Sequence, residues 1–565
     1  MRGADFLVPV LALLMGAATL LVPPITHAQS VDVDSEAPRP AVRSSEPPAN
    51  QAEPLVLTVR KAVQTALEQN LDLQAAQLDV RDADAQVQEA WGNLYPSLDL
   101  TGSYTRNVVT ANPFAGSDAL TLLGGGGETE WLAFNERRRL DNNPETDPIP
   151  FSTFTQRQRD SIAAAGISLG GAGGNPFGVD NEFRGGLQLT QTLYSKQAFA
   201  SVKGSQQFKD VSRFARDRQV QEVTNRVITD YYRALLAQER ARVLQNSVDR
   251  AQKTLQEVST RVQQGVTPKA QRLGANVELS NARTQAIEAR NAADLAQDQL
   301  KRTIGLSPDR PIQLDGTLDE QRKDGLQNVS LETISMSRAV SQAIENRPDL
   351  QRARLNVELR DIQAEASRSA YFPRVEAVAN FSYSGRVPDD RSRVLTNDPN
   401  RPNQPTPFFF REQQRGFFND DFWNPSFSVG LQLNWNLFDG FQRSSRVQQA
   451  EIQRQRAELQ RDQLRRAVTL EVRRAVRDLE NARERIESQQ TNVRRAELNY
   501  DHVSQRVSEG VASQIELREA SEQLDQSRLN YLQAVHDYLV ARSDLETALG
   551  QPLTPTSESY LMTRR

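Results

Sequence analysis

The chain has few side chains whose type and spacing could support catalysis or bind a metal ion. Its 565 residues include three histidines, His27, His502 and His536, and no cysteine. No two of these histidines have the short spacing of zinc or other transition-metal ligands, and no nucleophile motif accompanies them. On helices, His502 and His536 are better interpreted as surface or packing residues than as a paired site. We therefore predict no enzyme activity, no metal site and no cofactor.

Two other clusters could in principle bind a ligand or a partner. The run Gly124–Gly127 is not followed by Lys-Ser or Lys-Thr, so it lacks the residues of a phosphate-binding loop. The triplet Phe408–Phe410 is compatible with a surface contact or with packing inside its own loop, and packing is the favoured interpretation. With a net charge of -4, the chain also lacks the basic character of a nucleic-acid binder.

The most regular pattern is instead a heptad repeat near the C-terminus. Six residues recur at intervals of seven: Val472, Leu479, Ile486, Val493, Tyr500 and Val507. A repeat held at seven residues predicts helices that wind around each other with a left-handed supercoil. The helix expected over 441–508 would be about 100 Å long. A turn at 509–511 and a capping box from Ser513 to Glu516 then predict a return helix that ends at Gly550.

The chain repeats this plan, which decides its architecture. Residues 62–73 match 339–350, Tyr95-Pro96 matches Phe372-Pro373, residues 259–266 match 504–511, and Gly305 matches Gly550. Each unit is predicted to run helix, strand, strand, long helix, shorter helix. We expect single opening helices over 58–95 and 331–372, and a mainly helical fold with a small β part.

Four segments alternate apolar and polar residues and are predicted to be strands, over about 97–106, 182–194, 374–384 and 426–438. Each is close to the length that crosses a bilayer when tilted. The residues expected to face lipid are Leu98, Leu100, Leu187, Leu189, Val375, Phe381, Val429, Leu431, Leu433 and Trp435. A half-buried strand in a soluble sandwich would show the same alternation, so that alternative stays open.

Four strands cannot close a barrel, and an open sheet edge is not tolerated in lipid. Closure requires further copies of the chain. Two copies would supply eight strands with a filled interior, and three would supply twelve and leave a lumen. The argument predicts an oligomer without choosing between these numbers. The strands are separated by two long inserts, 107–181 and 386–424, whose lengths are typical of functional or disordered loops.

The remaining segments complete the predicted organisation. Arg2, the apolar run 6–22 and Thr26-His27-Ala28 indicate a cleaved secretory signal peptide, with an uncleaved anchor as the alternative. The predicted domains are a signal peptide (1–28), a disordered lead (29–54), a first repeat unit (55–305), an equatorial linker (306–330), a second repeat unit (331–550) and a C-terminal tail (551–565).

Taken in order, these features resemble the TolC-type outer-membrane efflux proteins, also called outer membrane factors, over nearly the whole mature chain. The resemblance rests on residues 62–73 with their copy 339–350, on the Tyr95-Pro96 and Phe372-Pro373 switches, on Leu193-Tyr194 and Leu437–Gly440, and on the segments 261–265 and 506–510. It implies a homotrimer with a twelve-stranded barrel in the bacterial outer membrane and a helical tunnel in the periplasm. It also implies that the tips at Gly265, Val266, Gly510 and Val511 dock onto a periplasmic adaptor protein and an inner-membrane pump. The two inserts are longer than the loops usual in this family.

The resemblance further implies an acidic gate at the periplasmic entrance. Members carry acidic side chains six and nine residues past the tip glycine, where this chain has Glu516 and Glu519. The first unit has Gln271 and Gly274 at the same places. In a threefold assembly each glutamate would form a ring that favours cations. Glu516 also completes the predicted capping box, so gate and cap both remain open for it.

The function expected from these observations is a passive exit duct of a tripartite efflux or type I secretion system. Such a duct would carry small molecules or polypeptides from the periplasm or an inner-membrane pump to the exterior. The alternative is a non-channel coiled-coil protein of the surface or periplasm, whose strands form a soluble cap. The sequence does not name the exported substrate.

Overall fold

The computed structural model describes residues 54–108, 128–140, 147–164, 179–327, 335–389, 391, 393–395, 410–412 and 414–551. The predicted signal peptide, nearly all of the predicted lead, Gly124–Gly127, and the C-terminal tail after residue 551 lie outside these residues. The chain divides into two compact units, residues 1–57 with 307–315 and residues 58–306 with 316–565. In the first unit, β1 (Leu55–Leu57) pairs in parallel with β4 (Ile312–Leu314).

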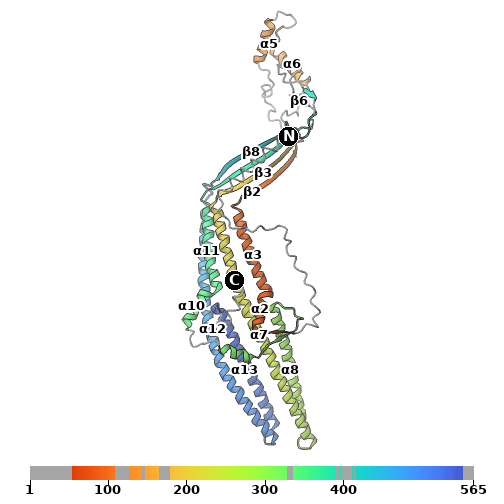
Figure 1. Cartoon of the computed structure of the whole chain (residues 1–565), viewed down its shortest axis with the longest axis vertical. Coiled ribbons are helices and arrows are strands. Elements are labelled where there is room, and N and C mark those ends of the chain that lie inside the picture. Colours follow the sequence, from red (N-terminus) through yellow and green to blue (C-terminus); the bar gives the residue numbers. More distant parts are fainter. Residues whose placement is uncertain are drawn as a thin grey trace. The chain divides into compact units, whose positions relative to one another are not determined.

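The second unit contains both repeats (Figure 1). Its first half consists of α2 (Val59–Gln69), α3 (Leu71–Gly92), β2 (Ser97–Arg106), α5 (Glu128–Leu140), α6 (Phe151–Ala164), β3 (Asn181–Tyr194), α7 (Lys196–Gln263) and α8 (Lys269–Ile304). Its second half consists of α9 (Leu318–Gln327), α10 (Met336–Asn346), α11 (Pro348–Ser369), β5 (Arg374–Val387), β6 (Arg393–Leu395), β7 (Phe410–Glu412), β8 (Trp423–Asn434), α12 (Gln442–Ser508) and α13 (Gln514–Leu549). The expected mainly helical fold with a small β part is confirmed.

Each opening helix is broken in two, so the prediction of a single helix was wrong in both repeats. Asn70 has an extended backbone, and its side-chain oxygen accepts a hydrogen bond from the Leu73 backbone N–H at 3.0 Å, which caps α3. In the second repeat Pro348 is the first residue of α11, and Arg347 before it is extended. A residue that precedes proline is pushed away from helical geometry, so the helix must restart there.

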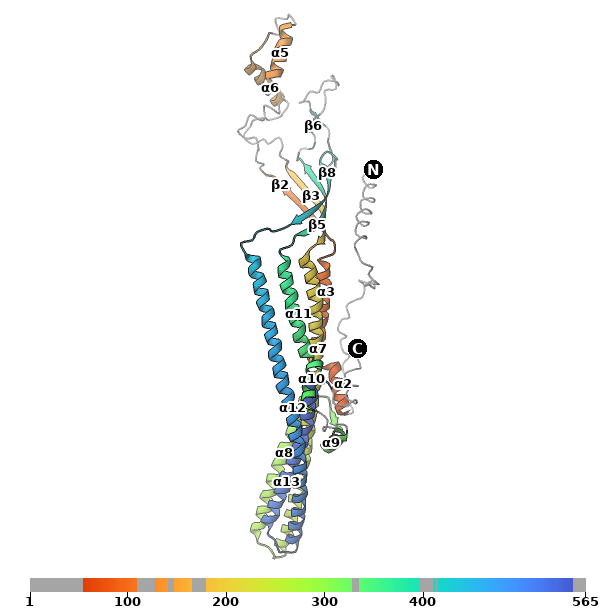
Figure 2. The same cartoon turned by 90° about the vertical axis from the view of Figure 1, so that its left-hand side faces the viewer.

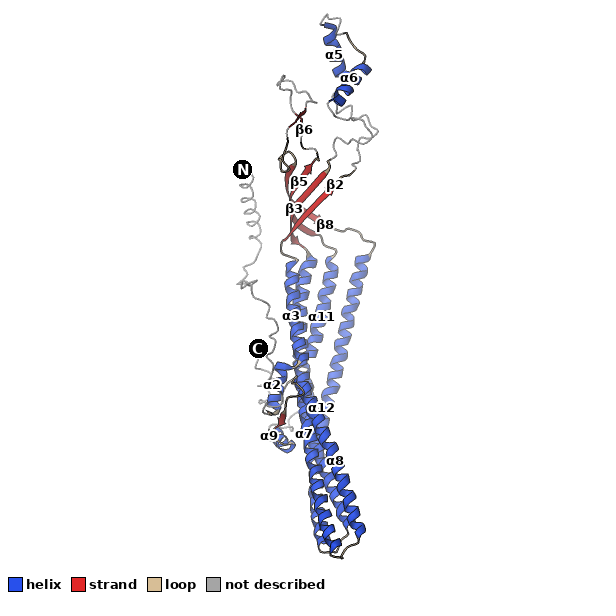
Figure 3. Cartoon of the chain, turned by 90° about the vertical axis from the view of Figure 1, so that its right-hand side faces the viewer, coloured by secondary structure: helices blue, strands red, loops and turns tan. Residues whose placement is uncertain are grey.

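The sheet is antiparallel, with the strand order β2-β3-β5-β8. Helix neighbours follow the same order, because α3 packs on α7, α7 on α11, and α11 on α12 (Figure 2, Figure 3). Beyond the helix breaks, the order becomes α8, α7, α13, α12. The sheet and the helices therefore have matching edges, with β2, α3 and α8 on one side and β8 and α12 on the other.

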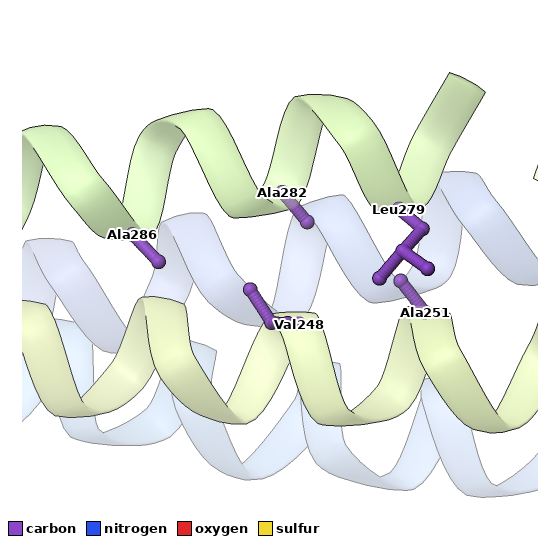
Figure 4. Close-up of a cluster of buried hydrophobic side chains, with 5 residues drawn as sticks. All are labelled: Val248, Ala251, Leu279, Ala282 and Ala286. Carbon is purple, nitrogen blue, oxygen red and sulfur yellow. The ribbon is translucent and has the colours of Figure 1, made fainter. Parts of the chain in front are cut away.

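The buried core of each hairpin is a thin seam of small and branched residues between two helices. Between α7 and α8 it contains Val248, Ala251, Leu279, Ala282 and Ala286 (Figure 4). Between α12 and α13 it contains Val503, Val507, Leu517 and Ala520. Alanine at these positions lets the helix backbones approach closely, and the heptad residues Val472, Leu479, Ile486 and Val507 are all buried as their spacing requires. Within the described part of the chain, no helix has both the length and the hydropathy of a membrane span.

The inserts contain secondary structure that the sequence analysis did not predict. In the first insert, α5 and α6 pack through Trp131 and Phe151, whose ring centroids lie 5.5 Å apart. The Asn135 side chain exchanges two hydrogen bonds with the backbone of Ile149, at 2.9 and 3.1 Å. In the second insert β6 pairs with β7, which includes Phe410, while Phe408 and Phe409 lie outside the described residues.

Candidate functional site

The strand register places apolar side chains on one face of the sheet. Directly paired residues of antiparallel strands share a face. One row across the sheet consists of Leu100, Leu187, Phe381 and Phe427, and the next of Leu98, Leu189, Ala379 and Val429. Further along, Val375 pairs with Leu433 and Ala377 with Leu431. Nine of the ten residues predicted to face lipid therefore lie on a single apolar face.

The tenth residue, Trp435, is exposed but lies one residue beyond the strand, and its facing lipid stays a prediction. Strand β8 ends at Asn434, so the predicted strand over 426–438 is too long at this end and starts too late at the other. The Trp435 indole N–H donates a hydrogen bond to the backbone oxygen of Tyr371 at 3.1 Å. This contact turns the chain out of the sheet toward the end of α11, which strand alternation alone does not predict.

The opposite face of the sheet is polar. Its rows are Asp99, Gln188, Asn380 and Ser428, and then Thr101, Gly186, Ser382 and Ser426. Charged residues on this face pair with one another, as Glu182 does with Arg184 at 3.3 Å and with Arg386 at 3.5 Å. No described residue covers the apolar face along β8, where Val429, Leu431 and Leu433 are all exposed. The sheet thus has one apolar face and one polar face.

Aromatic side chains gather where the strands end away from the helices. Tyr104 stacks on Phe183 with ring centroids 4.8 Å apart, and Tyr383 stacks on Trp423 at 5.1 Å. A Cβ on Gly385 would lie 2.7 Å from the Trp423 ring, so glycine is what lets this ring lie across β5. Phe417 joins the cluster. Sequence analysis missed this cluster because Phe417 and Phe418 lie in an insert. The high proportion of aromatic residues in 417–423 was the sequence feature that could have indicated it.

The hairpin tips lie at the other end of α7 and α12. Gly265 and Gly510 have φ angles of 78° and 79°, a left-handed conformation that ends each long helix without a Cβ clash. Val266 and Val511 are exposed beside them. The two tips are also connected, because the Arg261 guanidinium donates hydrogen bonds to the backbone oxygens of Val507 and Ser508 at 3.2 and 3.4 Å.

The two candidate gate residues differ in their surroundings. Glu516 forms the capping box with Ser513, and Arg506 lies 3.8 Å from its carboxylate. The hydrogen bonds from Ser513, together with attraction to Arg506, lower the pKa of Glu516. Glu519 is exposed one turn further along α13. The cap assigned to Glu516 is therefore present, and both carboxylates remain accessible to solvent.

A buried ion pair joins the two hairpins above their tips. Arg250 of α7 contacts the Asp525 carboxylate of α13 and lies 3.3 Å from the hydroxyl of Ser521. Both side chains of the ion pair are largely buried. The Arg250 guanidinium also lies 5.9 Å from the ring centre of Tyr500 on α12, so three helices meet here.

Replacing Arg250 with alanine should loosen this junction. The change leaves the Asp525 carboxylate buried without its cation, which typically costs about 3–5 kcal/mol. We expect faster amide hydrogen exchange in 500–530 of the detergent-solubilised protein. The matched control is Arg528→Ala, which removes a pair with Glu497 that is much more exposed than the Arg250 pair and should change exchange little. Equal effects of the two variants would show that Arg250 does not hold the hairpins together.

A two-faced antiparallel sheet, continued directly into two long helical hairpins, is the subunit architecture of an outer-membrane channel. The chain belongs to the outer membrane efflux protein family, whose sequence profile matches residues 62–124, 150–306 and 339–551, well over half of the chain. The family is one of channels rather than enzymes. No curated protein sequence matches the chain significantly.

Solved structures show the same fold at low sequence identity. The CmeC outer-membrane channel of Campylobacter jejuni has a TM-score of 0.62 at 15% identity, over 87% of this chain and 85% of that one. CusC has a TM-score of 0.61 at 17% identity, over 87% and 92% of the two chains. The outer-membrane protein VceC of Vibrio cholerae has a TM-score of 0.59 at 14% identity, over 88% and 96%. The recognised resemblance to outer membrane factors is confirmed.

Proposed function

We propose that three copies of this chain close into a passive exit duct, with a twelve-stranded barrel in the outer membrane and a helical tunnel in the periplasm. The duct would serve a tripartite efflux or type I secretion system and pass small molecules or polypeptides outward. A pump in the inner membrane would supply the energy. The observation that carries this proposal is the two-faced sheet, with a continuous apolar face on one side and a polar face on the other.

The matching edges of the subunit support closure by further copies. Strands β2 and β8 each have one unpaired edge in the order of the sheet. The helices at the same two edges expose large apolar side chains: Leu71 and Leu78 on α3, Leu273, Val277, Ile287 and Leu295 on α8, and Leu459, Leu470 and Leu498 on α12. The two edges differ, so a copy can be joined head to tail with the next, and such contacts generate a ring when the rotation between copies closes.

The polar face supports three copies over two. Eight strands would leave an interior that side chains fill, whereas twelve leave a water-filled lumen. The inward-facing rows contain serine, threonine, asparagine, glutamine and Asp99, which require hydration or hydrogen-bond partners. A lumen supplies that water.

The apolar face and its aromatic ends support insertion in lipid. Barrels of the outer membrane carry an apolar band flanked by aromatic residues at both interfaces. Here the cluster around Trp423 lies at one end of the apolar rows and Trp435 just beyond the other. At the hairpin tips, the exposed Val266 and Val511 offer small apolar contacts, and we place adaptor docking there.

The proposal is tested by extraction and conductance. The mature protein should need detergent for extraction, migrate as a heat-modifiable trimer, and give steps of ion current in planar lipid bilayers. A water-soluble monomer without conductance would overturn the proposal and favour the alternative, a coiled-coil protein whose strands form a soluble cap.

A second prediction addresses the proposed gate. Replacing Glu516 and Glu519 together with glutamine should relieve block of the reconstituted channel by divalent or other multivalent cations, because two rings of carboxylates are neutralised. Glutamine can still complete a capping box, so this variant removes charge and keeps the cap. The measurement is the cation concentration that halves the single-channel current.

The matched control is Ser513→Ala, which removes the side-chain acceptor of the cap and keeps both carboxylates. Loss of the cap typically costs about 1 kcal/mol of helix stability. If cation block falls with Ser513→Ala but not with the double glutamine variant, Glu516 acts as a cap and neither glutamate belongs to the gate.

A further inference from the structure

The return segment between β8 and α12 exposes three large apolar side chains. Leu437, Phe438 and Phe441 are 75%, 73% and 73% exposed, and the rings of Phe438 and Phe441 lie edge to face with centroids 5.7 Å apart. Together they form what we call the return patch, at the open edge of the subunit. In the first repeat, the corresponding Leu193 and Tyr194 are less exposed and lead directly into α7.

The backbone of this segment is held in a strained conformation by its surroundings. Phe441 has a φ of 66°, and among the described residues no other non-glycine residue has a positive φ. Such a backbone is unfavourable for a residue with a Cβ and persists only where the surroundings determine it. Here Arg443 holds the segment, because its guanidinium donates to the Asp439 carboxylate at 3.1 Å and to the Asn436 backbone oxygen at 2.6 Å. The Arg443 contacts thus fix the backbone of the segment on which the exposed patch lies.

The other edge of the subunit has exposed aromatic residues at the corresponding level. Trp91, near the end of α3, is 40% exposed, and Tyr95, just before β2, is 51% exposed. Strand β2 begins at Ser97, immediately after these residues, and β8 ends at Asn434, immediately before the return patch.

Strand direction brings these two sets together. Neighbouring strands of the sheet alternate in direction, so β8 of one copy would run antiparallel to β2 of the next. The end of β8 would then lie beside the start of β2. We propose that the return patch of one copy receives Trp91 and Tyr95 of the neighbouring copy, so that each joint of the ring is sealed by aromatic packing where the barrel meets the helices. This inference rests on the proposed function.

Cysteine cross-linking tests the contact directly, because the chain contains no native cysteine. The variant carrying Tyr95→Cys and Phe438→Cys, purified in detergent as the full mature chain, is treated with a mild oxidant or a short bismaleimide. We expect covalent dimers and trimers on denaturing gels, since the two positions meet between copies. Each single variant should remain monomeric after denaturation.

The control pair is Tyr95→Cys with Tyr194→Cys, because β2 and β3 are neighbours within one copy. This pair should give no ladder of covalent oligomers. A heat-modifiable oligomer that forms without a ladder in the Tyr95 and Phe438 variant would overturn the contact and leave the duct intact, with lipid as the occupant of the patch. Absence of any oligomer under native conditions in the unmodified chain would instead overturn the proposed function.

A second variant separates ring packing from backbone strain. Phe441→Gly removes the aromatic ring and also removes the strain, because glycine tolerates a positive φ. If Phe441 affected only the strain of its own backbone, the oligomer of this variant should resist heat at least as well as the unmodified protein. Our proposal predicts the opposite: the oligomer should dissociate at a clearly lower temperature, measured on denaturing gels of samples heated to increasing temperatures. Gly440→Ala is the matched change, because a Cβ there meets no atom within 4 Å and adds strain without removing a ring.

Discussion

Replacing Arg347 with methionine should destabilise the helical part of the protein by about 3–5 kcal/mol. Arg347 is 2% exposed and forms a two-pronged pair with the Asp349 carboxylate at 3.1 and 2.7 Å. It also contacts Glu471 at 2.9 Å and donates to the Ala548 backbone oxygen at 3.3 Å. The side chain therefore joins the break between α10 and α11 to α12 and to the end of α13. Without the guanidinium, Asp349 stays buried without its hydrogen-bonded cation, and only the weaker attraction of Arg218 remains.

The first repeat supplies a matched control. At the corresponding junction Arg226 pairs with Asp72 at 3.5 Å, and both side chains are more than half exposed. Exposed pairs contribute about 0–1 kcal/mol, so Arg226→Ala should change stability little. Chemical unfolding in detergent, followed by circular dichroism, measures both. If Arg347→Met costs no more than Arg226→Ala, the buried pair does not hold the junction. Adding Asp349→Leu to Arg347→Met should recover part of the loss, because the buried carboxylate is then gone and the remaining one, Glu471, is half-exposed to water.

The same pair makes stability depend on pH. Burial by itself raises the pKa of Asp349, but hydrogen bonds from Arg347 and attraction to it outweigh burial, and the net pKa is lowered. A carboxylate with a lowered folded-state pKa contributes stability that is fully present above its unfolded pKa of about 3.9. That contribution is lost as pH falls below this value through the folded pKa. The parent protein should therefore lose stability below about pH 4, and Arg347→Met should lose less over the same interval.

The parts of this fold that could be predicted are those set by local periodicity. The heptad residues from Val472 to Val507 and the alternation from Phe427 to Leu433 each report directly which face of their element is buried or apolar. Duplication of the chain then fixed the order of the elements. For these reasons the fold class and the family were accessible from the sequence alone.

The parts that were missed depend on contacts between distant residues or on a single cap. The break at Asn70 rests on a side-chain cap and on a hydrogen bond to the Thr303 backbone oxygen, 233 residues away. The end of β8 depends on the hydrogen bond from Trp435 to Tyr371. The helices α5 and α6 are held by Trp131 and Asn135, inside an insert whose length suggested a loop. At the candidate site, a single chain shows the cap formed by Glu516, whereas a ring of glutamates would require the neighbouring copies.

Replacing Leu431 with arginine should prevent assembly in the outer membrane. Leu431 is 75% exposed on the apolar face of β8, in the row between Val429 and Leu433, and is paired with Ala377. An arginine facing lipid near the centre of a bilayer costs about 2–4 kcal/mol. A trimer carries the substitution three times, so the cost is incurred in every subunit of the ring. The heat-modifiable oligomer should disappear from the outer-membrane fraction, and the chain should accumulate in the periplasm or be degraded.

The neighbouring residue makes this test specific. Gln432→Arg adds the same side chain one position along the same strand, where it would lie on the polar face opposite Glu376. In a water-filled lumen the new guanidinium stays hydrated and gains a carboxylate neighbour, so assembly should match the parent. A sheet that capped a soluble coiled coil with its apolar face in a protein core would also reject arginine at Leu431, so the variants are read together with extraction. Loss of the oligomer for Leu431→Arg, with retention for Gln432→Arg of an oligomer that only detergent extracts from the outer-membrane fraction, places lipid on one side of this sheet and water on the other, which is the physical condition for a duct.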